Sequence, residues 1–115
     1  MKSNYGDPHR NLVDFAHVPV VKRMTRMPVC IDPSHSVGSR HASPDQILDT
    51  MHVTAQGVIA GANMVIVDFH PDPTSALVDG PQALTMDELE WFIEDMNIAR
   101  AAYEKRCKLQ TQQNN

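Results

Sequence analysis

Two short apolar runs stand out in a chain that otherwise mixes apolar and polar residues. Neither run shows the alternation of apolar and polar residues that is typical of a strand with one solvated face. They are Met27–Ile31 and Met64–Phe69. Each is followed directly by an aspartate or a histidine and then a proline. Continuous apolar runs of this length are typical of strands that are buried on both faces of a parallel sheet. We therefore predict two buried strands.

Apolar residues at helical spacing surround these runs. A first helix is predicted to begin between Asp14 and Pro19 and to end near Arg26. A second helix is predicted from Ser43, in a Ser-Pro-Asp-Gln start signal, to about Gly61.

The third helix is predicted from Met86 to about Arg106, because Thr85 and Glu88 have the spacing of a capping box. The segment 34–42 is expected to be a loop. The resulting order of helix, strand, helix, strand and helix indicates parallel βα units. A sheet of two strands leaves two edges open, so we expect other copies or another chain to complete it.

Composition narrows the class of protein. The chain has 115 residues and a net charge of -4, and no more than two Lys or Arg residues are adjacent, which argues against a nucleic-acid partner. We read two cysteines without CxxC spacing, and no signal peptide, as signs of a reduced, cytoplasmic protein. The apolar runs are too short to cross a membrane. Residues 1–10 are expected to be flexible and residues 109–115 to form a disordered tail.

Side chains that can bind a metal follow both apolar runs. Asp32 and His35 follow the first run, Asp68 and His70 lie at the end of the second, and Asp79 lies in the loop beyond. Functional residues of parallel βα folds gather at the carboxyl ends of the strands, and His with carboxylates suits Mn, Fe, Co or Zn. The competing interpretation is that these aspartates cap turns and that the histidines are hydrogen-bonded bystanders.

Three segments carry a resemblance to a known family. DPSHSVG, residues 32–38, closely matches the loop after the seventh strand of 3-deoxy-heptulosonate-phosphate (DAHP) synthases. VDFHPDPTSALVDGPQALT, residues 67–85, matches the segment after their eighth strand, and NLVDFAHVPVVKR, residues 11–23, resembles a helix upstream. The chain is thus similar to the C-terminal part of the DAHP synthases that resemble 3-deoxy-octulosonate-phosphate synthases. Its DPSH sequence favours the heptulosonate branch.

The resemblance implies an α/β fold that is part of a TIM (β/α)8 barrel. Residues 11–108 would supply two parallel strands and three helices, completed by oligomerisation or by a partner chain. The family condenses phosphoenolpyruvate with erythrose 4-phosphate, in the shikimate pathway towards aromatic amino acids, and uses a divalent metal. We therefore expect a phosphorylated substrate of the phosphoenolpyruvate type.

The resemblance also assigns roles to residues. His35 and Asp79 match the metal-binding His and Asp of the family. Asp68 occupies the position of the metal-binding Glu, and its side chain is shorter by about 1–1.5 Å. The candidates for contacts to the metal ligands or to a phosphate are Asp32, Ser34, Arg40 and His70.

Alternatives stay open for individual residues. Arg40 is a candidate phosphate contact or a solvated loop charge, and His70 is a neighbour of the metal or a simple strand-end histidine. The family's metal-binding Cys, and the Lys and Arg groups that hold the substrate phosphates, lie upstream of the matched part. We do not expect Cys30 to replace that Cys and predict that it is a buried, small apolar residue.

Three functions fit these expectations. The chain could be part of a DAHP synthase that is inactive alone and needs a partner carrying the first six strands. Four copies could instead close one barrel and bind metal through repeated sets of His35, Asp68 and Asp79. The third alternative is a non-catalytic module that docks on a full-length synthase.

Overall fold

The fold is that of a computed structural model, which describes residues 14–38, 40–72 and 83–113. The side chains of residues 35, 36 and 113 lie outside this description. The elements in chain order are α1 (His17–Thr25), β1 (Cys30–Ile31), α2 (Pro33–Val37), α3 (Asp49–Ile59), β2 (Met64–Val65), β3 (Phe69–His70), β4 (Leu84–Thr85), the short 3-10 helix η3 (Met86–Glu88) and α4 (Leu89–Gln113).

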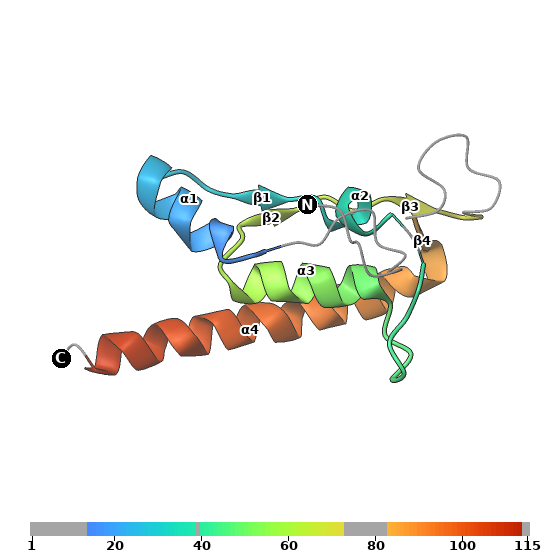
Figure 1. The fold of residues 1–115 in the computed structure, drawn as a ribbon. Helices are drawn as coiled ribbons and strands as arrows, with labels where there is room; N and C mark the ends of the chain where they lie inside the picture. The colour runs from blue at the N-terminus through green and yellow to red at the C-terminus, as the bar shows by residue number, and fades with distance from the viewer. Residues whose placement is uncertain (1–13, 39, 73–82, 114–115) are drawn as a thin grey trace.

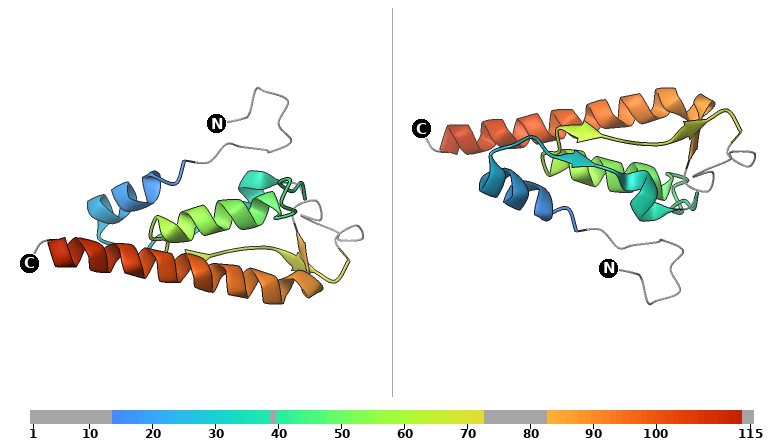
Figure 2. Two further views of the ribbon diagram at one scale, coloured as in Figure 1. Left: turned by 90° about the horizontal axis from the view of Figure 1, so that it is seen from below. Right: turned by 90° about the horizontal axis from the view of Figure 1, so that it is seen from above.

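All strand pairs among these elements are parallel. β1 pairs with β2, placing Cys30 opposite Met64, and β3 pairs with β4, placing Phe69 opposite Leu84. Both α3 and α4 lie along one side of the strands and run back in the opposite direction (Figures 1 and 2). The predicted α/β class and the parallel βα arrangement are therefore confirmed.

Each strand is shorter than the apolar run that predicted it. The run 27–31 is paired over Cys30–Ile31, and the run 64–69 is paired over Met64–Val65 before Phe69 joins β4. A ladder exists only where a neighbouring strand exchanges backbone hydrogen bonds. Within the described residues β1 has β2 as its only neighbour, so the sequence predicted one sheet where the structure has two small ones.

The β1–β2 sheet has one covered face and one open face. Val65, Val67 and Phe69 pack on the core between the strands and the two long helices. Met64 and Ile66 alternate with these residues and are 61% and 50% exposed. Successive side chains of a strand point to opposite faces, so the described part of the chain covers only one face of this sheet.

Cys30 belongs to the open face. The prediction that it is buried was wrong, because Cys30 stands opposite Met64 in the ladder and is exposed with it. In a closed barrel this face would line the interior, where a small apolar residue would be buried.

The second helix begins later than predicted, at Asp49 rather than at Ser43. The backbone N–H of Ser43 donates to the carbonyl of Ile47 at 2.9 Å, and Gln46 adopts a left-handed conformation with φ of 68°. These bonds close a tight turn, followed by an antiparallel bridge between Ala42 and Leu48. The Ser-Pro-Asp-Gln signal therefore forms a turn and not a helix start, because its polar groups are satisfied locally.

The capping box at the last helix is confirmed. The backbone N–H of Thr85 donates to Glu88 at 2.7 Å, and the Thr85 side chain binds the backbone of Glu88 in return. The helix continues past the predicted end at Arg106 to Gln113, so the predicted disordered tail is helical over residues 109–113. Lys, Leu and Gln are good helix formers, and neither Gly nor Pro interrupts this stretch.

The segment after β1 also differs from the prediction of a loop. Pro33 opens the short helix α2, consistent with the preference of proline for the first helical position. No helix in the described part of the chain is long and apolar enough to cross a membrane.

Candidate functional site

A hydrogen bond joins the two segments that follow β1 and β2. Ser34 lies in the first turn of α2 and is completely buried. Its hydroxyl oxygen accepts a hydrogen bond from the backbone N–H of Asp68 at 3.1 Å. The carboxyl ends of the two parallel strands are thus held side by side, at the end of the molecule where α2 meets β3 (Figure 1).

The backbone of Asp68 is held on both sides. Its N–H binds Ser34, and its carbonyl accepts the N–H of Leu84 at 2.8 Å. Because Val67 and Phe69 point into the core, the half-buried side chain of Asp68 points to the open face of the sheet. The backbone of Asp68 is therefore held at the strand end.

His70 follows on the same face, two residues further along. Its Nδ1 accepts the backbone N–H of Asp72 at 2.9 Å across a turn at Pro71. A neutral imidazole that accepts through Nδ1 carries its proton on Nε2. His70 is half-buried, so its Nε2–H can serve as a donor at the strand end.

The predicted metal ligands are only partly within the described residues. The backbone of His35 lies in α2, next to Ser34, but its side chain lies outside the description, as does the whole of Asp79. Asp32, just before α2, is exposed. Among the described residues no three His, Cys, Asp or Glu side chains come together in a way that could hold a metal ion. A divalent ion here would need His35 and Asp79 beside Asp68, and that set stays a prediction.

Arg40 forms an ion pair that the sequence analysis missed. Both oxygens of Glu88 lie 3.0 Å from its Nη2, and its Nη1 donates to the carbonyl of Ala83 at 2.6 Å. Burial alone would raise the pKa of Glu88, but the hydrogen bonds from Arg40 and Thr85 outweigh it and leave that pKa below its usual value.

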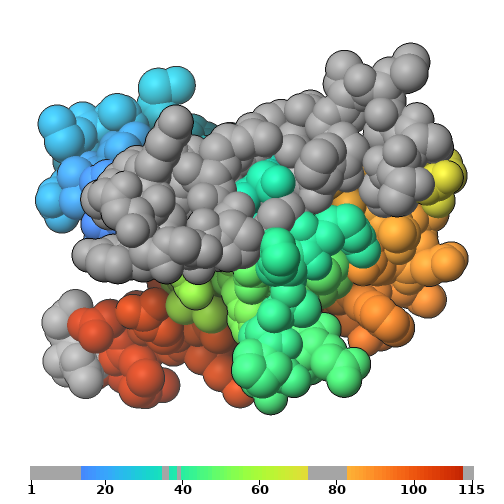
Figure 3. Space-filling model, turned by 45° about the vertical axis from the view of Figure 1, so that its right-hand side comes forward, coloured from blue at the N-terminus to red at the C-terminus, as the bar shows by residue number. Residues whose placement is uncertain are grey.

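This ion pair ties the segment between α2 and α3 to the start of α4, and the two adjoin in the space-filling view (Figure 3). Arg40 is therefore not a solvated loop charge, and a contact between Arg40 and a phosphate stays a prediction. The capping-box position of Glu88 was visible in the sequence, but its partner 48 residues away was not.

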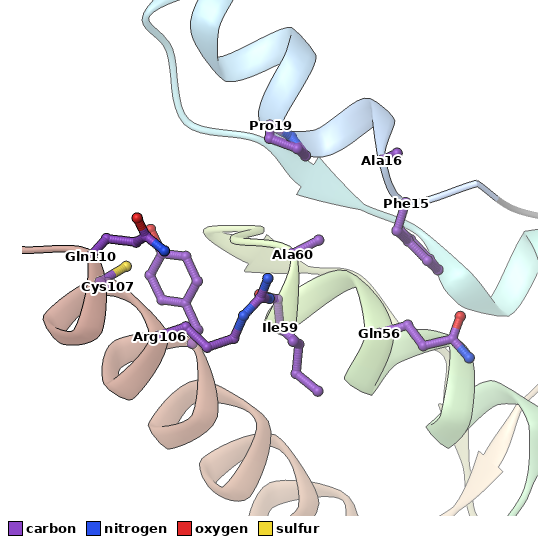
Figure 4. Close-up of a pocket in the computed structure, with 10 residues that line it drawn as sticks. Phe15, Ala16, Pro19, Gln56, Ile59, Ala60, Arg106, Cys107 and Gln110 are labelled. Carbon is purple, nitrogen blue, oxygen red and sulfur yellow. The ribbon is translucent and has the colours of Figure 1, made fainter. Parts of the chain in front are cut away.

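A hollow lies at the other end of the molecule. It is a groove of about 600 Å3 between α1, the end of α3 and the last turns of α4 (Figure 4). Phe15 and Ile59 line it, together with Tyr103 and Cys107 from α4. A hydrogen bond with Cys107 raises the pKa of Tyr103, and the nearby Arg100 opposes this effect. Because the groove lies far from the strand ends at Asp68, we do not assign it to the predicted chemistry.

Comparisons with known proteins show the family to which this chain is related. The model of the DAHP synthetase I family matches residues 2–104. Phospho-2-dehydro-3-deoxyheptonate aldolase of Thermotoga maritima is 32% identical over 87 residues, which cover 76% of this chain and 24% of that protein. A 2-dehydro-3-deoxyphosphooctonate aldolase of Legionella pneumophila is 31% identical over 101 residues, covering 84% of this chain and 37% of that protein.

Solved structures show the same relationship. The crystal structure of the Thermotoga maritima DAHP synthase superposes with a TM-score of 0.71 at 30% identity, covering 87% of this chain and 28% of that one. A truncated form of 3-deoxy-D-arabino-heptulosonate 7-phosphate synthase from the same organism gives a TM-score of 0.71 at 29% identity and covers 88% and 36%. The chain spans well under half the length of these relatives. Its family match, covering nearly the whole chain, shows that it belongs to the DAHP synthetase I family.

Proposed function

We propose that this chain supplies the last two βα units of a (β/α)8-barrel synthase that joins phosphoenolpyruvate to erythrose 4-phosphate. The remaining units would come from further sequence or from a partner chain. Family membership supports the reaction class, and the share of the relatives that the chain covers supports its role as part of a barrel. The open face of the β1–β2 sheet is the surface that the missing strands would enclose.

The hydrogen bond between Ser34 and Asp68 is the observation that carries the proposal. It joins the first matched motif, residues 32–38, to Asp68 of the second at the carboxyl ends of parallel strands. Active sites of (β/α)8 enzymes lie at that end of the barrel.

A divalent metal would be held by His35, Asp68 and Asp79. When bound, such an ion polarises a carbonyl or phosphoryl oxygen of the substrate. The protein's own contribution is to hold the backbone of Asp68 at the strand end and to orient His70, two residues further on, through its Nδ1. The substrate phosphates need cationic groups, which the family places on earlier strands, so we propose that the chain is inactive alone.

The acceptor sugar is proposed from the DPSH sequence, residues 32–35. A heptulosonate has seven carbons, of which phosphoenolpyruvate supplies three, so its acceptor is a four-carbon aldose phosphate. An octulosonate needs a five-carbon acceptor instead. The two kinds of relative matched here differ in this respect, and an assay with both acceptors separates them.

A chimera tests this proposal. Residues 11–108 would replace the corresponding segment of the Thermotoga maritima enzyme, and phosphoenolpyruvate consumption would be measured with Mn2+ and each acceptor. We expect activity with erythrose 4-phosphate and its loss in chimeras carrying His35→Ala or Asp79→Ala. A matched His17→Ala chimera, altered at an exposed residue of α1, should stay active. A folded chimera without activity would contradict the proposal.

A further inference from the structure

Three large apolar side chains lie exposed along one line of α4. Trp91, Ile98 and Leu109 are 69%, 70% and 56% exposed. Their spacings of seven and eighteen residues place them within about 20° of each other around the helix and about 27 Å apart from end to end. Phe92 and Ala99, one residue further on, are buried in the core. The stripe is therefore a second surface of α4, separate from its core face.

Most charges are segregated along the same helix: Glu90, Glu94 and Asp95 lie in its first half, whereas Lys105, Arg106 and Lys108 lie in its second half. The two exceptions, Arg100 and Glu104, pair with each other at 3.3 Å. This arrangement suits the helix macrodipole, but that effect is confined to the first and last turns. Glu94 and Lys105 lie well inside α4 and are both exposed, on the same side of the apolar stripe.

The apolar stripe and the charges make α4 complementary to the α4 helix of a second copy that runs antiparallel to it. With a two-fold axis beside residue 100, Trp91 meets Leu109 of the second copy, and Ile98 meets its Ala102. On one flank of the stripe Glu94 meets Lys105 of the second copy. On the other flank Asp95 meets Arg106, whose Nη1 donates to the carbonyl of Ile59 within its own chain.

We propose that α4 is a self-association surface through which two copies of this chain pair antiparallel. A two-fold interface requires one patch that complements itself, and the stripe with its oppositely charged flanks meets that requirement. α4 lies beside α3, on the side of the strands opposite the open sheet face, and its first turn follows β4 (Figures 1 and 2). The dimer therefore leaves the open sheet face uncovered, and it does not depend on the proposed catalytic function.

The test is the solution mass of the intact chain, measured by sedimentation over a range of concentrations. We expect a dimer for the parent and a dissociation constant raised at least about tenfold by Ile98→Lys, because a lysine would be desolvated at the centre of the interface. Lysine is a good helix former, so circular dichroism should show an unchanged helix. A monomeric parent, or an Ile98→Lys variant that dimerises as the parent does, would overturn the proposal.

Charge exchange tests the antiparallel register. Glu94→Lys and Lys105→Glu should each weaken the dimer, and the double variant should restore it, because the pair is rebuilt with its signs reversed. If the double variant is as weak as the singles, the register is wrong. Ile66→Lys, on the open sheet face, is the matched control and should leave the dimer intact. Loss of the dimer in this control would overturn α4 as the surface, because it would show association through the sheet.

Discussion

The hydroxyl oxygen of Ser34 accepts a hydrogen bond from the backbone N–H of Asp68, across 34 residues of sequence and 3.1 Å of space. Ser34 is completely buried, and Asp68 is half-buried. A buried hydroxyl without a partner is costly, so this bond fixes the position of α2 relative to the end of the second apolar run. The relative placement of both matched motifs depends on it.

Ser34→Ala should lower the free energy of unfolding by about 1–2 kcal/mol, because the Asp68 N–H loses its acceptor in a partly buried place. Urea denaturation measures this change. Thr111→Ala is the matched control, since that hydroxyl donates to the Cys107 carbonyl on the exposed end of α4 and should matter little. Equal stability of the Ser34→Ala variant and the parent would contradict the role given to this bond.

Asp68→Glu should tighten the binding of Mn2+ to the chain. The added methylene moves the carboxylate outward by about 1–1.5 Å, to the reach of the glutamate at the matching position of the family. Calorimetric titration with Mn2+ measures the affinity. Asp87→Glu makes the same change at an exposed position in η3 and should have no effect. If Asp68→Glu weakens the binding of Mn2+, the shorter aspartate side chain is the one that suits the ion. The inferred ligand geometry would then be wrong.

Glu88 should make stability depend on pH in the acid range. Its pKa is lower in the folded chain than its usual value of 4.5, so the unfolded chain binds more protons around that pH. The stabilising contribution is complete above about pH 4.5 and is lost as the pH falls through the lowered pKa.

Glu88→Gln isolates this contribution, because glutamine keeps the capping hydrogen bond but not the charge that pairs with Arg40. At neutral pH we expect a loss of about 1 kcal/mol, since the pair is partly exposed. The difference between parent and variant should shrink on acidification in denaturant titrations. A difference that is constant from neutral pH down to pH 3 would contradict this account.

Gly57→Ala should destabilise the chain although alanine is the better helix former. A Cβ at position 57 would meet the Cδ1 of Ile31 and lie 3.0 Å from the ring of Phe15. Overpacking of this kind costs about 1–3 kcal/mol, more than the gain of about 1 kcal/mol in helix propensity. Thermal unfolding measures the change, and Gln56→Ala, exposed on the same helix, is its control. Adding Ile31→Val should recover part of the loss.

Local signals in the sequence were reliable where their partners were close in the chain. The Thr85–Glu88 capping box involves residues three apart and was predicted correctly. The similar signal at Ser43 failed, because Gln46 adopts a positive φ and closes a turn that a helix start does not allow. Thr85 and Glu88 bind each other's backbone N–H groups through their side chains, whereas the backbone N–H of Ser43 bonds to the carbonyl of Ile47 within its turn.

Long-range contacts could not be predicted in the same way. The sequence placed Asp68 at a strand end, because the apolar run ends one residue later, at Phe69. It did not show that Ser34 would bind the Asp68 backbone or that Arg40 would pair with Glu88. Nor did it show that Cys30 would be exposed, since burial on the second face requires strands that the described residues do not include. The pattern of apolar residues shows which faces of a helix or strand are apolar. Which element covers each of those faces depends on the rest of the fold.

The most direct test of the central claim is paramagnetic broadening of backbone amide signals by Mn2+ in solution. A metal held at the joined strand ends should broaden the signals of residues 32, 34–38 and 67–70 first. The signals of Ala60 and Arg106, at the far end beside the apolar groove, should persist. His35→Ala and Asp79→Ala should each abolish the selective broadening. Broadening that spares both Ser34 and Asp68, or that is unchanged in both variants, would contradict a metal site at the carboxyl ends of β1 and β2.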